Sequence, residues 1–142
     1  MSALIEAKAL QRHYRRGIET VKALDGVDLT IRQGELVSIL GPSGSGKTTL
    51  INLLSCLDAP TAGSLTITGK SVAGLAEDEL VEIRRGTLGF VFQRFHLLPT
   101  LTVAENVELP LLFLGRRPLS GMTAELLSKV GLADRARHLP GE

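Results

Sequence analysis

Polar and apolar residues alternate in two stretches near the start of the chain. Residues 3–10 (ALIEAKAL) and 24–31 (LDGVDLTI) follow a period of two at part of their positions, which predicts strands with one buried face. The basic segment between them, RHYRRGIETVK, is interpreted as a connection whose charges are solvated. A third stretch, SLTIT at residues 64–68, predicts a small hairpin with Gly69 in its turn. These segments indicate a first, β-rich part of the fold.

Two other runs are apolar at almost every position. LVSIL (residues 36–40) and LGFVF (residues 88–92) are typical of strands that are buried on both faces of a parallel sheet. Strands of this kind, alternating with helices, predict an α/β fold. Helices are predicted from Lys47 to about Leu57, over residues 77–85, after a capping box at Thr102 and Glu105, and over residues 123–131.

The segment GPSGSGKTT, residues 41–49, lies between the first apolar run and the first helix and fits the pattern GxxxxGK(S/T). Its glycines permit positive φ angles, so that backbone N–H groups and the helix N-terminus can form a nest for an anion. Lys47 would reach the β- and γ-phosphates of a nucleotide, and Thr48 would offer its hydroxyl to a magnesium ion. The candidate nucleotide-binding residues of this loop are Gly41, Pro42, Ser43, Gly44, Ser45, Gly46, Lys47, Thr48 and Thr49.

Composition narrows the class of protein without changing this prediction. The 142 residues carry 16 Lys and Arg against 15 Asp and Glu, with the basic residues scattered, so the charge does not indicate a nucleic-acid partner. The single cysteine, Cys56, is expected to be a small buried hydrophobe. No apolar run is long enough to span a bilayer, and a cytoplasmic location is expected. His96 has no second ligand at metal spacing and is interpreted as structural or interfacial.

The glycine loop is followed by LDAPTAGSLTITGKSV, LGFVFQ and LLPTLTVAENVELPL, and this combination resembles the ATP-binding subunit of an ABC transporter. The run GFVFQRFHLLPTLTVAENVELPLL is most similar to the group that serves lipoprotein release and macrolide export. The resemblance covers about Leu4 to Pro140 and implies a P-loop NTPase core with a parallel sheet, an N-terminal antiparallel β subdomain and the start of a helical subdomain. It places the β subdomain and core in residues 1–92, and the Q-loop and helical subdomain in residues 93–142.

The resemblance also implies roles for residues outside the loop. Tyr14 takes the aromatic position that stacks on adenine, and Gln93 takes the place of the Q-loop glutamine, which contacts Mg²⁺ and the attacking water. ATP and Mg²⁺ are the implied cofactors, with Thr48 and Gln93 as metal contacts. The segment from Arg94 to about Leu114 matches the region that docks on a membrane permease, at the inner face of the membrane. A second ATP-binding subunit is the other implied partner.

Three catalytic motifs of that family do not occur in these residues: the LSGGQ signature, the strand that ends in Asp-Glu, and the switch histidine. No catalytic residue is therefore assigned beyond a possible water contact of Gln93, and hydrolysis is not expected from this chain alone. Two interpretations stay open, the N-terminal part of an ATPase that powers export and a truncated module that binds nucleotide or permease without turnover. A small metabolite kinase is disfavoured by the apolar segment that follows Gln93.

The absence of the strand that ends in Asp-Glu also affects the expected stability of the chain. The missing strand would lie between LVSIL and LGFVF, so both would lose a shared neighbour and keep open edges. We therefore expect the isolated chain to be marginally stable or to self-associate.

Overall fold

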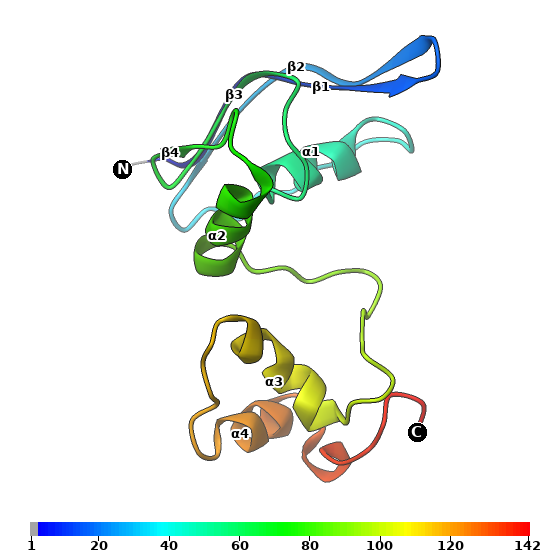
Figure 1. Cartoon of the computed structure of the whole chain (residues 1–142), viewed down its shortest axis with the longest axis vertical. Coiled ribbons are helices and arrows are strands. Elements are labelled where there is room, and N and C mark those ends of the chain that lie inside the picture. Colours follow the sequence, from blue (N-terminus) through cyan, green and yellow to red (C-terminus); the bar gives the residue numbers. More distant parts are fainter. Residues whose placement is uncertain (1–2) are drawn as a thin grey trace. The chain divides into compact units, whose positions relative to one another are not determined.

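The computed structural model describes residues 3–142, and the chain divides into two compact units, Met1–Gly89 and Phe90–Glu142. The first unit contains a four-stranded antiparallel sheet with strand order β2-β1-β3-β4, shown in Figure 1. Its strands are β1 (Ala3–Arg16), β2 (Glu19–Arg32), β3 (Ala62–Ile67) and β4 (Lys70–Ser71).

The hairpin of β1 and β2 is longer than the alternating pattern predicts. Arg16 pairs with Glu19, so the strands continue to a tight turn that contains Gly17 at φ 59°. The interpretation of RHYRRGIETVK as a connecting loop is therefore wrong, because its backbone groups are paired across the hairpin. As a consequence Tyr14 lies within β1. The smaller hairpin of β3 and β4 is confirmed, with Gly69 at φ 81° between the strands.

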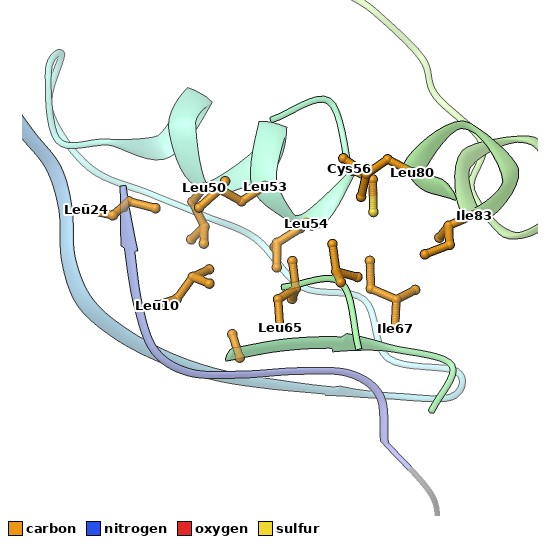
Figure 2. Packing of buried hydrophobic residues seen from close by; sticks show 12 residues of the cluster. Leu10, Leu24, Leu50, Leu53, Leu54, Cys56, Leu65, Ile67, Leu80 and Ile83 are labelled. Carbon is orange, nitrogen blue, oxygen red and sulfur yellow. The ribbon is translucent and has the colours of Figure 1, made fainter. Parts of the chain in front are cut away.

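Two helices pack on this sheet and complete one hydrophobic core. They are α1 (Lys47–Leu54) and α2 (Glu77–Thr87). Figure 2 shows side chains of the sheet and of both helices directed toward one another. Cys56 is fully buried as predicted, although α1 ends before it. The largest fully buried side chains of this unit are those of Leu10, Leu53, Cys56, Leu65, Ile67 and Val72.

The two segments predicted as parallel strands do not form a sheet. Residues 36–40 and 88–92 carry no strand assignment, and within residues 3–142 neither one pairs with a neighbour. A parallel strand exists through hydrogen bonds to strands beside it, so an apolar sequence alone is not sufficient. Leu36 and Leu40 are 98% and 89% exposed, and Val91 is 103% exposed. The prediction of a parallel P-loop sheet is thus not realised in this structure.

The second unit is helical. It contains α3 (Val103–Phe113), α4 (Met122–Lys129) and the 3-10 turn η1 (Ala133–Arg135). The predicted capping box is confirmed, since Thr102 Oγ1 accepts from Glu105 N and Thr102 N donates to Glu105 Oε2. A side-chain hydrogen bond joins α3 to α4, because Thr123 Oγ1 donates to Glu108 Oε1 over 2.6 Å.

Candidate functional site

The glycine loop leads directly into α1, and its backbone has the conformation that the sequence predicts at two positions. Gly44 has φ 80° and Gly46 has φ 88°, both in the left-handed region that side chains disfavour. Gly46 is also crowded, because a Cβ atom there would lie 2.5 Å from the carbonyl oxygen of Ala23 on β2. Glycine at 46 therefore allows the start of α1 to approach β2 closely.

The N-terminus of α1 is open toward the loop. Gly46 is the N-cap residue of α1, and no side chain forms a capping hydrogen bond there. The first turn, which includes Thr48 and Thr49, has no acidic residue. The first N–H groups of a helix have no partner within the helix, and the helix dipole adds partial positive charge there. An anion fits this terminus, since it would accept from these groups without meeting a competing carboxylate.

Lys47 folds back on its own loop. Its Nζ donates to the carbonyl oxygens of Gly41 and Pro42, each over 2.7 Å, and lies 3.4 Å from Ser45 Oγ. The ammonium group is thereby held beside the helix N-terminus and faces oxygen acceptors. Phosphate oxygens accept the same kind of charge-assisted hydrogen bond, so the loop suits a phosphate chemically.

A cavity of about 610 Å³ lies over this loop. Its second wall comes from β2, where Lys22 adds another cation. Lys22 Nζ donates to Asp25 Oδ2 over 3.1 Å, and this hydrogen bond is the main reason that the pKa of Asp25 is lowered. Lys22 is not among the predicted site residues, because the sequence pattern assigned it to a loop. The lining residues are Val21, Lys22, Ala23, Ser43, Gly44, Ser45, Gly46, Lys47, Thr48 and Thr49.

Tyr14 stands on β1 directly opposite Val21, one of the residues that line the cavity. Directly opposed residues of an antiparallel pair are neighbours, so Tyr14 lies beside this wall of the cavity, although it is not itself one of the lining residues. The Tyr14 hydroxyl donates to Asp58 Oδ2 over 2.7 Å, and the Arg12 guanidinium lies 4.7 Å from the ring centroid. Burial disfavours the charged form of Arg12, but Tyr14 and Asp58 more than compensate and raise its pKa.

The remaining predicted metal contact, Gln93, is exposed and belongs to the second unit. Its role beside the loop therefore stays a prediction. Within residues 3–142 no cluster of three or more His, Cys, Asp and Glu side chains could hold a metal ion. Of the predicted metal contacts, Thr48 is the one placed at the cavity, where its hydroxyl could serve as one ligand.

The segment from Arg94 to Leu114 exposes apolar side chains. Phe95 is 87% exposed, and Leu97 and Leu98 are about half exposed at 51% and 44%. Asn106 is a residue of α3 that no sequence pattern singled out, and it fixes the turn before the helix, residues 98–102, to the helix itself. Its amide donates to the carbonyl oxygens of Leu98, Leu101 and Thr102, and its Oδ1 accepts from Leu98 N.

His96 lies near the start of this segment in a strained conformation. It has φ 49° and packs edge-on against Phe92, with ring centroids 5.0 Å apart. This packing is compatible with the structural role that the sequence suggests.

In the part of the chain that the structure describes, no helix has the length and apolar character to cross a membrane.

The sequence of this chain is similar to those of known proteins. The ABC transporter family model matches residues 24–142. The macrolide export ATP-binding/permease proteins MacB of Rhodopseudomonas palustris and Hyphomonas neptunium are each 49% identical, over 97% and 98% of this chain. An uncharacterized ABC transporter ATP-binding protein of Bacillus subtilis, YknY, is 43% identical over 98% of the chain.

These relatives are longer than this chain, which spans 21% and 22% of the two macrolide exporters and 61% of YknY. Among solved structures, the ATP-binding cassette MJ0796 in a dimeric post-hydrolysis state with ADP and Pi matches with a TM-score of 0.85. That match has 45% identity and covers 96% of this chain and 62% of the cassette. The chain therefore belongs to the ABC transporter family, and within that family it is similar to the MacB proteins.

Proposed function

We propose that this chain binds ATP with Mg²⁺ at the loop of residues 41–49, as part of the ATPase of a MacB-like exporter. The observation that carries the proposal is the position of Lys47, whose ammonium is held at an uncapped helix N-terminus by two carbonyl oxygens of the loop. The ammonium and the N–H groups of the helix N-terminus face one cavity, where both can donate hydrogen bonds to the oxygens of a polyphosphate.

Each residue of the loop has a role that follows from its chemistry. Lys47 would exchange its loop carbonyls for β- and γ-phosphate oxygens, and the N–H groups around Gly44 and Gly46 would donate to the β-phosphate. Thr48 would contact Mg²⁺ from the first turn of α1. Tyr14 would stack on adenine, and Gln93 would contact Mg²⁺ and the attacking water. Bound ATP supplies the phosphoanhydride whose cleavage powers transporters of this family.

The partners follow from the second unit and from the relatives. The exposed apolar side chains of Phe95, Leu97 and Leu98 support docking of a membrane permease on the segment from Arg94 to about Leu114. Leu101 is half-buried and would contribute less to such a surface. The dimeric state of the related cassette supports a second ATP-binding domain as the other partner.

The nucleotide site is tested by Lys47→Ala, with Mg·ATP affinity measured by calorimetry on the full chain. Loss of hydrogen bonds from a charged donor costs about 1.5–3 kcal/mol, so we expect binding to weaken at least about tenfold. Lys8→Ala is the matched control, because Lys8 lies in the same unit outside the cavity and pairs with Glu6.

Equal affinities of Lys47→Ala and the unaltered chain would refute the site assignment. Circular dichroism of both variants must match, so that a loss of binding is not a loss of fold. The measurement reads binding and not turnover, and it therefore applies equally if the chain holds nucleotide without hydrolysing it.

A further inference from the structure

The carboxylate of Asp58 joins β1 to the loop that follows α1. Its Oδ2 accepts from the Tyr14 hydroxyl over 2.7 Å and from Arg12 Nε over 2.9 Å. Its Oδ1 lies 2.6 Å from the second guanidinium nitrogen of Arg12 and accepts from Ala59 N over 2.8 Å. Both carboxylate oxygens are thus engaged, and the two-point contact with Arg12 fixes the plane of the group.

This cluster is shielded from water more than an ordinary surface ion pair. The side chains of Arg12 and Asp58 are only 22% and 19% exposed, whereas those of the exposed pair Lys8 and Glu6 are 67% and 41% exposed. Shielding strengthens hydrogen bonds to charged groups and makes an unpaired partner costly. The Tyr14 ring is therefore held in one orientation rather than free to turn on the strand.

The position of the cluster links it to the phosphate loop. Asp58 follows the helix that Lys47 begins, and its N–H donates to the carbonyl oxygen of Asn52 in that helix. Thr61, three residues after Asp58, also attaches this segment to β1, since Thr61 Oγ1 accepts from His13 N. One short segment after α1 is therefore attached both to the phosphate-binding helix and to the strand that carries Tyr14.

We propose that Asp58 is a positioning residue for base recognition, which rests on the proposed nucleotide site. It holds the Tyr14 ring through the hydroxyl, and it holds Arg12 against one ring face, so that an adenine base stacks on the opposite face. Asp58 does not touch the nucleotide itself. Its effect is therefore confined to the part of the affinity that comes from the base.

The test compares Mg·ATP with inorganic tripolyphosphate, which has the phosphates but no base. Asp58→Ala in the full chain is expected to weaken ATP about two- to tenfold, the range that an aromatic stacking contact is worth, and to leave tripolyphosphate affinity unchanged. Asp58→Asn is the conservative control, because its amide oxygen still accepts from the Tyr14 hydroxyl. It should retain most of the ATP affinity.

Two further measurements isolate the action through Tyr14. In the Tyr14→Phe background the hydroxyl is absent, so adding Asp58→Ala should weaken ATP by less than it does in the unaltered chain, because only the support of Arg12 remains to be lost. Tyr14 is the only tyrosine and the chain has no tryptophan, so its ultraviolet fluorescence reports on this ring alone. Removal of the carboxylate acceptor should raise the emission and lower its anisotropy, and Asp58→Asn should resemble the unaltered chain.

These measurements distinguish a failure of the positioning role of Asp58 from a failure of the proposed nucleotide site. If tripolyphosphate binds and Lys47→Ala weakens that binding at least about tenfold, the phosphate site stands. An Asp58→Ala chain that then weakens ATP and tripolyphosphate equally, or neither, would overturn the positioning role. If Asp58→Ala does not fold, Tyr14→Phe decides the matter, because unchanged ATP affinity in that variant also overturns it. Failure of the unaltered chain to bind either ligand would overturn the proposed function.

Discussion

Gly46 combines two constraints that only glycine meets. It begins α1 at φ 88°, and its missing side chain leaves room for the carbonyl oxygen of Ala23 on the adjacent strand. The loop thereby brings Lys47 against β2, where Val21 and Lys22 form the second wall of the cavity. The shape of the site thus depends on one position where backbone meets backbone.

Gly46→Ala should destabilise the chain more than Gly34→Ala. Gly34 has φ 80°, and a Cβ atom there would have no neighbour within 4 Å, so its substitution adds only the left-handed strain of roughly 1–2 kcal/mol. At Gly46 the same strain adds to a contact of 2.5 Å with a backbone oxygen that cannot turn away. Urea unfolding of both variants measures the difference, and equal free energies of unfolding would contradict the crowding argument.

At the scale of single elements, α3 is held by contacts at its N-terminus. Thr102 and Glu105 form the capping box, and the backbone N–H groups of Val103 and Ala104 donate to carbonyl oxygens of His138 and Ala136. Hydrogen bonds from the Thr102 backbone N–H, and then from its hydroxyl, lower the pKa of Glu105. The ionised carboxylate therefore stabilises the start of the helix.

Acid should loosen α3 through Glu105. Because the folded state lowers the pKa of this group, its stabilisation is present above the unfolded pKa of about 4.3 and is lost as the pH falls through the folded value. Glu105→Gln keeps an acceptor oxygen but cannot titrate. The amide protection factors of α3, which are corrected for the intrinsic exchange rate at each pH, should therefore fall more in the unaltered chain than in the variant between about pH 5 and pH 3. Parallel profiles would contradict this assignment.

At the scale of the whole molecule, the chain leaves apolar segments uncovered in each unit. Residues 36–40 expose Leu36 and Leu40 in the first unit, and Phe95 and Phe113 are exposed in the second at 87% and 69%. Large apolar areas open to water favour association with other molecules. These segments explain why a domain with 44% hydrophobic residues has so small a core.

The 142-residue chain in isolation is expected to self-associate. The double variant Leu36→Ser with Leu40→Ser should shift its size-exclusion profile toward the monomer at equal concentration, because it removes the two most exposed apolar side chains of residues 36–40. Ile18→Ser is the matched control, since Ile18 is 104% exposed in the tight turn between β1 and β2, away from that segment. A concentration-independent monomer for the unaltered chain would contradict the prediction.

Features that depend on a few neighbouring residues follow from the sequence. The positive φ angles of Gly44 and Gly46, the capping box at Thr102, the start of the helix at Glu77 and the burial of Cys56 agree with their predictions, because caps, turns and helical periodicity act within about one turn of chain. The helix predicted over residues 77–85 extends to Thr87. The family resemblance, carried by motifs of this kind, is likewise confirmed.

Only the tertiary structure decided which distant residues meet. Asp58 reaches Tyr14 and Arg12 across 44 and 46 residues, and no local pattern marks that contact. The cavity wall at Lys22 depends on the register of the β1–β2 hairpin, which continues past its alternating core. Residues 36–40 show the opposite case, since an apolar run becomes a strand only where a neighbour pairs with it. Local chemistry thus specified the glycine loop, while long-range pairing determined what surrounds it.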